Sequence, residues 1–335
     1  MKSYILKLSR KENLTQDEIQ QIMQAVMKGE TSTEEVREIL LLLNSKGPTV
    51  EEITGAAKIM RQFSVKVRTR HEIILDTCGT GGDKKDTFNI STIAAFVVAG
   101  AGVVVAKHGN RSVSSRCGSA CILEALGVNL EMGQKKLGEC LDKVGMAFLF
   151  AQKLHPAMKN VASVRKSLGV KTIFNILGPL TNPAGATHQM VGVYSRDLLD
   201  PVAQVLRNLG LKRALVVHGH DGLDEVTTTG ITFVSEFTGQ EIVDYDIDPQ
   251  ELGIRLAQEK DLKGGDIHTN VRIAKDILQG TEGPKRDIVV LNAACALYAS
   301  EKVKNISAGI SLAVKSIDGG SAKKKLEELI VFSRA

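Results

Sequence analysis

Several absences narrow the classes of protein to which this sequence can belong. It contains no Trp and only 4% aromatic residues, so it is poor in the flat side chains on which proteins stack single-stranded nucleic acid. Its longest apolar run, residues 93–106, is interrupted by two glycines and is too short to cross a membrane. The first residues lack a long apolar segment ahead of a small-residue cleavage site, which argues against a secretory signal.

Cysteine usage and net charge are those of an ordinary cytoplasmic protein. The five cysteines form no CxxC pair, which predicts free thiols in a reducing compartment. The 43 Lys and Arg exceed the 38 Asp and Glu, giving a net charge of +5. This mild excess fits an anionic small molecule as well as a nucleic acid. At 335 residues and 43% hydrophobic, the chain has the balance of a globular protein with one large domain or two.

Residues 1–70 have the pattern of a helical domain. Apolar residues recur at helical spacing, and Gly47-Pro48 separates two of the expected helices. Each of three expected helices follows a Thr-x-x-Glu capping box, whose two side chains bond the free amides of the first turn. The boxes pair Thr15 with Glu18, Thr31 with Glu34, and Thr49 with Glu52.

From residue 71 the pattern changes to alternating strands and helices. A strand, a helix and a strand in this order form a βαβ unit, which requires a parallel sheet. We expect strands at residues 73–75 and 103–105, helices at 91–99 and 120–126, and further strands at 189–193, 213–217 and 231–237.

The predicted fold class is α/β, with a small all-helical domain beside a larger α/β domain whose mainly parallel central sheet is flanked by helices. We expect residues 1–70, completed by 155–185, to form the helical domain. Residues 71–154 and 186–335 are expected to form the α/β domain, with hinges near residues 70 and 180. Gly264-Gly265-Asp266 repeats the triplet at residues 81–83, a match short enough to arise by chance.

A glycine-rich segment, GTGGD at residues 79–83, follows the first expected strand, and Asn89, Ser91 and Thr92 stand at the start of the next helix. Glycines let a backbone approach a phosphate closely, and a helix N-terminus offers it unpaired amides. The segment is neither a P-loop nor a dinucleotide fingerprint. The three polar residues could instead simply cap the helix.

A second polar segment, KHGNRSVSS at residues 107–115, follows the next parallel strand. It therefore opens at the same carboxyl edge of the sheet, where open α/β sheets bind ligands. Its two cations and its Asn and Ser donors suit a polyphosphate, although a solvated surface loop has the same composition. Ser119 would add a donor at the start of the following helix or merely cap it.

The adjacent carboxylates Asp224 and Glu225 follow a third expected strand. Opposite phosphate donors, such a pair suits magnesium shared between protein oxygens and a substrate phosphate. A neighbouring acidic pair can also be plain solvated surface. His218, His220 and Asp221 lie close by, but no Cys or HExxH motif accompanies them to favour zinc.

Taken together, these segments closely resemble the anthranilate phosphoribosyltransferase family. The resemblance covers nearly the whole chain, including the helical N-terminus and LNAA at 291–294. It is carried by DTCGTGGD at 76–83, TFNIST at 87–92, KHGNRSVSSRCGSA at 107–120, TIFNILGPLTNP at 172–183 and DGLDEV at 221–226.

This resemblance implies a fold shared with the pyrimidine nucleoside phosphorylases and a reaction of tryptophan biosynthesis. Such enzymes transfer phosphoribose from phosphoribosyl pyrophosphate (PRPP) to the amine of anthranilate, with Mg²⁺ as cofactor and usually as homodimers. By the same resemblance the partners are these small molecules, with neither nucleic acid nor a membrane, and the location is cytoplasmic.

The family's binding residues carry over by motif. Ser91, Asp224 and Glu225 are expected to hold magnesium directly or through water, and Gly79, Asn110, His155 and Arg165 are expected to contact anthranilate. The expected PRPP-binding residues are Gly79, Gly82, Asp83, Thr87, Asn89, Ile90, Ser91, Thr92, Lys107, His108, Gly109, Asn110, Arg111, Ser112, Val113, Ser114, Ser115 and Ser119.

The chemistry leaves mainly positioning to the protein. The aromatic amine of anthranilate is uncharged near neutral pH and is nucleophilic without a strong base, so we assign no general base. His108 is the nearest candidate, with a structural role or a phosphate contact as alternatives. Two rival functions remain: a pyrimidine nucleoside phosphorylase, which needs no metal-binding carboxylate pair, and a non-catalytic relative that binds nucleic acid.

Overall fold

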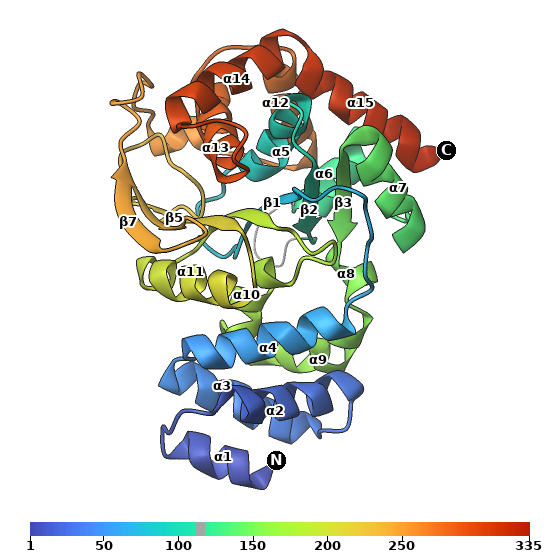
Figure 1. The fold of residues 1–335 in the computed structure, drawn as a ribbon, viewed down its shortest axis with the longest axis vertical. Helices are drawn as coiled ribbons and strands as arrows, with labels where there is room; N and C mark the ends of the chain where they lie inside the picture. The colour runs from blue at the N-terminus through green and yellow to red at the C-terminus, as the bar shows by residue number, and fades with distance from the viewer. Residues whose placement is uncertain (112–117) are drawn as a thin grey trace.

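The computed structural model describes residues 1–111 and 118–335. A bundle of helices lies at one end of the molecule, and a sheet with helices on both faces occupies the rest (Figure 1). The predicted fold class is therefore confirmed. Within the described residues, no helix is both long and apolar enough to cross a membrane.

The helical end combines the N-terminal helices with two later ones, α9 and α10, which pack against α2, α3 and α4. Their apolar faces share one core, which includes Ile19, Leu43, Ile53, Val161 and Leu177. The elements are α1 (Lys2–Ser9), α2 (Gln16–Lys28), α3 (Thr33–Lys46), α4 (Val50–Phe63), α9 (Lys159–Leu168) and α10 (Ile173–Leu177), with the short helices α8 (Ala151–Leu154) and η1 (Pro156–Met158) beside them.

Two of the three predicted capping boxes are confirmed, those of Thr15 with Glu18 and of Thr49 with Glu52. The third prediction is wrong by one residue, because Ser32 caps α3 and pairs with Glu35. The sequence TSTEE contains two overlapping boxes. The structure selects the second, because Ser32 Oγ accepts the Glu35 amide at 3.2 Å, and the helix that follows buries Val36, Ile39, Leu40 and Leu43.

In the described residues seven strands form one sheet with the order β3-β2-β1-β4-β5-β6-β7. The first five in this order are parallel, and β6 and β7 are added antiparallel at one edge. Their bounds are β1 (Leu75–Gly79), β2 (Val105–Gly109), β3 (Met146–Phe150), β4 (His188–Gly192), β5 (Arg213–Gly219), β6 (Thr232–Phe237) and β7 (Ile242–Ile247).

The structure corrects two predicted strands near the glycine-rich segment. The strand predicted at 73–75 begins only at Leu75, and Ile73 is 45% exposed. The strand predicted at 103–105 instead runs from Val105 to Gly109, so Lys107 and His108 belong to the strand itself rather than to the segment after it. The strands predicted at 189–193, 213–217 and 231–237 are found within two residues at each end, whereas β3 and β7 were not predicted.

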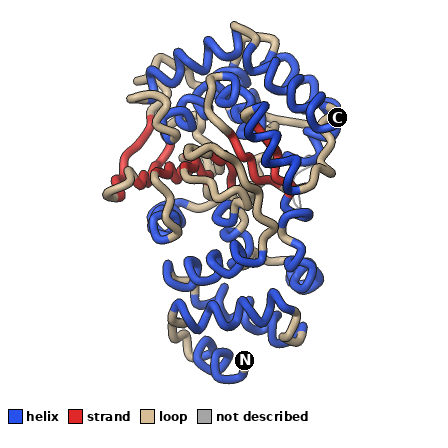
Figure 2. The backbone as a smooth tube through the Cα atoms, turned by 45° about the vertical axis from the view of Figure 1, so that its right-hand side comes forward, coloured by secondary structure: helices blue, strands red, loops and turns tan. Residues whose placement is uncertain are grey.

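Helices cover both faces of the sheet (Figures 1 and 2). One face packs against α5 (Ile90–Gly100) and α13 (Pro284–Ala299) around Leu75, Phe96 and Leu291, and the other packs against α11 (Leu199–Asn208). The remaining elements are α6 (Ser119–Leu126), α7 (Gln134–Val144), α12 (Ile267–Leu278), α14 (Ile306–Asp318), α15 (Ser321–Arg334), and the 3-10 helices η2 (Pro179–Thr181), η3 (Arg196–Leu198) and η4 (Glu259–Leu262).

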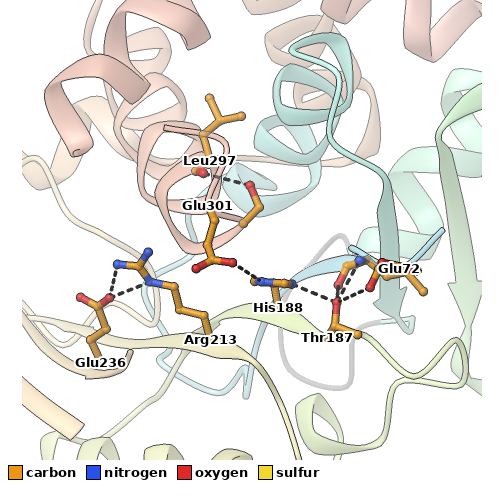
Figure 3. A network of polar contacts seen from close by, with 9 residues as sticks. Glu72, Thr187, His188, Arg213, Glu236, Leu297 and Glu301 are labelled. Carbon is orange, nitrogen blue, oxygen red and sulfur yellow. Dashed lines mark hydrogen bonds and ion pairs between the residues drawn. The ribbon is translucent and has the colours of Figure 1, made fainter. Parts of the chain in front are cut away.

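A polar network ties the sheet to the end of α13 (Figure 3). The fully buried His188 lies between Thr187 Oγ1, at 2.9 Å, and Glu301 Oε2, at 3.3 Å. Beside it Arg213 forms an ion pair of 2.5 Å with the buried Glu236. The contact of His188 with Glu301 thus links β4 to the residues that follow α13, and the Arg213–Glu236 pair joins β5 to β6.

Candidate functional site

The three segments singled out in the sequence meet at the carboxyl edge of the parallel strands. The glycine-rich loop leaves β1, the second polar segment leaves β2, and the loop with Asp224 and Glu225 leaves β5. Two hydrogen bonds join the first and third of these loops directly. Gly81 N–H donates to Asp224 Oδ2 at 2.7 Å, and Ser91 N–H donates to Glu225 Oε1 at 3.2 Å.

Glycines make the close approach of these loops feasible. Gly81 and Gly82 have φ values of 67° and 80°, in the left-handed region that favours glycine. A Cβ on Gly79 would lie 2.5 Å from Asp224 Oδ2, and one on Gly192 would overlap the carbonyl oxygen of Asp224. Where the acidic loop crosses β1 and β4, both strands therefore need a residue without a side chain.

The carboxyl groups of Asp224 and Glu225 are both partly buried, and their pKa values are raised. Burial raises the pKa of Glu225 to about 7, against a lowering by Lys107. The pKa of Asp224 is raised well above its usual range by burial, by Asp83 and by Glu225. Bringing a cation to this place would relieve the repulsion.

These residues fit a magnesium ion that is shared with a substrate. The donors are carboxylate and hydroxyl oxygens, which Mg²⁺ prefers. The described parts of the chain contain no group of three or more His, Cys, Asp or Glu side chains arranged to hold a metal by themselves. An ion here would therefore complete its coordination with substrate oxygens and water.

Lys107 is buried at the heart of this arrangement and points across the sheet edge. Its ammonium donates to the carbonyl oxygen of Thr77 and, at 3.3 Å, to Ser91 Oγ. Ser91 also donates its amide to Glu225. Lys107, Ser91 and Glu225 thus form one continuous chain of contacts from β2 through the start of α5 to the acidic loop.

The other predicted residues of the glycine-rich loop lie around the start of α5. Asp83 Oδ1 accepts the Lys85 amide at 3.2 Å, and Thr87 forms an isolated β-bridge with Lys263. Asn89 stands at the N-cap position of α5, Ile90 is its first residue, and Thr92 is buried in its first turn.

The segment after β2 is described only in part. Ser112, Val113, Ser114 and Ser115 lie outside the described residues. Asn110 accepts from Ser119 Oγ at 3.2 Å through its carbonyl oxygen, which places the first residue of α6 beside the end of β2. Arg111 is exposed and pairs with Glu124 at 2.7 Å, and a Cβ on Gly109 would collide with Ser119 Oγ.

The rings of His108 and His155 lie beside one another, with their centroids 5.0 Å apart and their planes tilted by 50°. Burial and the neighbouring His155 lower the pKa of His108 to about 3, and burial together with Lys66 lowers that of His155 to about 4. Both rings are consequently neutral at pH 7, and among the residues that the structure describes neither Nε2 atom has a hydrogen-bond partner.

Arg165 lies on α9 with its guanidinium 5.3 Å from the centre of the Phe174 ring. Among the described residues it has no ion pair with a carboxylate. Partial burial lowers its pKa. An arginine held on an aromatic ring without an acidic partner is suited to bind the carboxylate of a ligand.

Two buried residues that the sequence reasoning missed hold this site from behind. Asp76 in β1 accepts from His108 N–H at 3.0 Å and from Asn182 Nδ2 at 2.8 Å, and burial raises its pKa to about 6. Asn292 on α13 bonds both the amide and the carbonyl of Val226, at 2.9 and 2.7 Å. The only signal in the sequence for either residue was its place in a family motif, DTCGTGGD at 76–83 for Asp76 and LNAA at 291–294 for Asn292.

The zinc alternative finds no support in the arrangement of its residues. His218 Nδ1 bonds the carbonyl oxygen of Val193 at 2.7 Å, and Asp221 accepts from the hydroxyls of Thr227 and Thr229 at 3.0 and 2.7 Å. These partners instead shape the turn that leads into Asp224.

Two family models match the chain. The model described as "Glycosyl transferase family, helical bundle domain" matches residues 2–64, and "Glycosyl transferase family, a/b domain" matches residues 71–323. Fold and site together therefore define a two-domain glycosyl transferase.

Individual relatives narrow this class. The anthranilate phosphoribosyltransferase of Acetivibrio thermocellus is 48% identical over 335 residues, covering 100% of this chain and 97% of that protein. The crystal structure of the Thermus thermophilus enzyme is 43% identical, with a TM-score of 0.94 over 99% of both chains. The Saccharomyces cerevisiae enzyme in complex with PRPP and Mg is 28% identical, with a TM-score of 0.92, covering 99% of this chain and 97% of that one. The chain belongs to the anthranilate phosphoribosyltransferase family, as its motifs led us to expect.

Proposed function

We propose that this chain transfers the phosphoribosyl group of PRPP to the amine of anthranilate, releasing pyrophosphate, at the carboxyl edge described above. The observation that carries the proposal is the contact of the glycine-rich loop and the start of α5 with Asp224 and Glu225. The glycine-rich loop, the start of a helix and a partly buried acidic pair then lie together, as a magnesium pyrophosphate requires.

PRPP would lie along the two polar loops. The assigned residues are Gly79, Gly82, Asp83, Thr87, Asn89, Ile90, Ser91 and Thr92 on the first loop, and residues 107–115 with Ser119 on the second. Asp224, Glu225 and Ser91 would hold Mg²⁺ directly or through water. Bound there, the ion would neutralise charge on the leaving pyrophosphate, which is where negative charge develops.

Anthranilate would approach from the side of the helical domain. Arg165 would clamp its carboxylate, with Gly79, Asn110 and His155 as further contacts. A neutral imidazole with a pKa of about 3 is a weak proton acceptor, so no base is assigned, and His108 belongs to the PRPP site as part of the second loop. The uncharged aromatic amine attacks once it is positioned.

The two domains would close over the substrates and exclude water from the cationic ribose. We propose residues 1–70 with 155–185 as one moving part and residues 71–154 with 186–335 as the other. We further propose a cytoplasmic homodimer. A dimer contact through the N-terminal helices is supported by two exposed apolar side chains, Leu6 on α1 and Leu41 on α3, which are 54% and 40% exposed. The cytoplasmic location is supported by the four described cysteines, which are free thiols.

The magnesium assignment is tested by removing charge while keeping shape. Asp224→Asn with Glu225→Gln should abolish Mg²⁺ binding in the presence of PRPP, measured by calorimetry, and reduce turnover by about two orders of magnitude or more. The control Asp244→Asn with Asp246→Asn removes the same charge from the exposed face of β7. Equal Mg²⁺ binding by the two double variants would refute the assignment.

A further inference from the structure

A segment distant in sequence packs on the PRPP loop. Gly264 N–H donates to the carbonyl oxygen of Asp86 at 2.9 Å, and Lys263 Nζ donates to the carbonyl oxygen of Lys85 at 2.8 Å. Lys263 also forms the β-bridge with Thr87. Residues 263 and 264 therefore contact the main chain of three consecutive loop residues, Lys85, Asp86 and Thr87.

The loop that is held has an uncommon backbone. Lys84 and Asp86 have φ values of 60° and 52°, in the left-handed region that side chains other than glycine rarely adopt. Both residues are exposed, so no burial of their side chains fixes this conformation. A loop of this kind persists when its surroundings over-determine it, and here the fixing contacts come from residues 263 and 264.

Gly264 is required for space rather than for backbone freedom. A Cβ at this position would lie 2.8 Å from the backbone nitrogen of Phe88 and 2.8 Å from Asn270 Oδ1. Asn270 is buried on α12, and its Oδ1 accepts the Gly265 amide at 3.0 Å. The segment with Lys263 and Gly264 thus packs tightly between α12 and the PRPP loop, and a side chain at Gly264 could not be accommodated without a shift of either.

We propose that Lys263, Gly264 and Asn270 form a clamp that preorganises the loop from Asp83 to Phe88 for PRPP. They are positioning residues and touch no substrate. The inference rests on the proposed assignment of Asp83 and Thr87 to PRPP. It gives a role to Gly264, the first residue of the triplet at 264–266.

Gly264→Ala tests the clamp by steady-state kinetics. We expect the KM for PRPP to rise about tenfold, as main-chain hydrogen bonds to the loop are lost, while the KM for anthranilate stays unchanged. Gly133→Ala is the matched control, because a Cβ there meets nothing within 4 Å. An unchanged KM for PRPP, or an equal rise for both substrates, would overturn the proposal.

A second variant avoids any risk to folding. Lys263 is exposed, and Lys263→Met removes only its bond to the loop, with the exposed Lys260→Met as control. Trypsin should cleave after Lys84 and Lys85 faster in Lys263→Met than in the control, and protection should require several times more PRPP. If PRPP protects both variants at equal concentration, the clamp is wrong. If PRPP does not protect even the unaltered chain, the assignment of the loop to PRPP is wrong instead.

Discussion

His108 and His155 are two neutral rings in contact, and their burial has a cost at acid pH. An unfolded histidine binds a proton below about pH 6.5, whereas the folded chain holds these two neutral down to pKa values of about 3 and 4. Between pH 6.5 and 4 acidification therefore favours unfolding. Asp76 acts in the opposite sense, because its folded pKa of about 6 exceeds its usual 3.8.

The contribution of each histidine can be measured from how steeply the free energy of unfolding depends on pH. Replacing one buried histidine removes one proton from the difference between the unfolded and folded chains. The free energy of unfolding of His155→Gln should therefore fall less steeply than that of the unaltered chain, by about 1.4 kcal/mol per pH unit between pH 6 and 4.5. Urea titrations at several pH values provide the measurement. Parallel slopes would show that His155 is protonated in the folded chain.

Arg165 carries the clearest prediction for substrate recognition. A charged hydrogen bond contributes about 1.5–3 kcal/mol, so Arg165→Ala should raise the KM for anthranilate by about tenfold or more. The KM for PRPP should change little. Lys166→Ala removes the neighbouring exposed cation and serves as control. Equal effects of Arg165→Ala on both substrates would rule out the proposed carboxylate clamp.

At the scale of elements, the start of α3 shows a choice between two capping residues that the local sequence leaves open. Ser32 caps the helix and Thr31 does not, although both lie three residues before a Glu. Ser32→Ala should lower the free energy of unfolding by about 1 kcal/mol, and Thr31→Ala by less than about 0.5 kcal/mol. Urea denaturation of the two variants measures both losses. A larger loss for Thr31→Ala than for Ser32→Ala would show that Thr31 caps the helix after all.

Local signals in the sequence identified most elements and failed where tertiary contacts decide. Lys107 and His108 look like turn residues, yet they end a buried strand because Thr77, Ser91 and Asp76 supply partners for them. The strand β3 is an unbroken apolar run, which periodicity alone cannot distinguish from a helix. The strand β7 carries Asp244 and Asp246 on an exposed edge, and Asp is depleted in strands.

The site illustrates the same limit. The sequence placed three polar segments at one sheet edge, since the carboxyl ends of parallel strands lie together. It could not show that Gly81 meets Asp224 or that Ser91 meets Glu225, because these pairs are more than 130 residues apart in sequence. Nor could it reveal Asn292, whose amide holds Val226 from a helix on the far side of the loop.

At the scale of the whole molecule, two cores lie on the two faces of one sheet. The core of the helical end continues through α11 to Val191 and Val216 in β4 and β5. The other core joins β1, β2 and β3 to α5 and α13. The proposed site lies at the edge between them. Movement of the helical end would therefore carry Arg165 relative to the loops of the α/β part.

The most direct test of the central claim is the loss of anthranilate fluorescence when PRPP is added. With Mg²⁺ present we predict a steady loss as the amine acquires its ribosyl substituent. We also predict that EDTA stops the loss and that fresh Mg²⁺ restores it. No loss from folded protein with Mg²⁺ and both substrates would contradict the account and direct attention to phosphorolysis of thymidine or uridine.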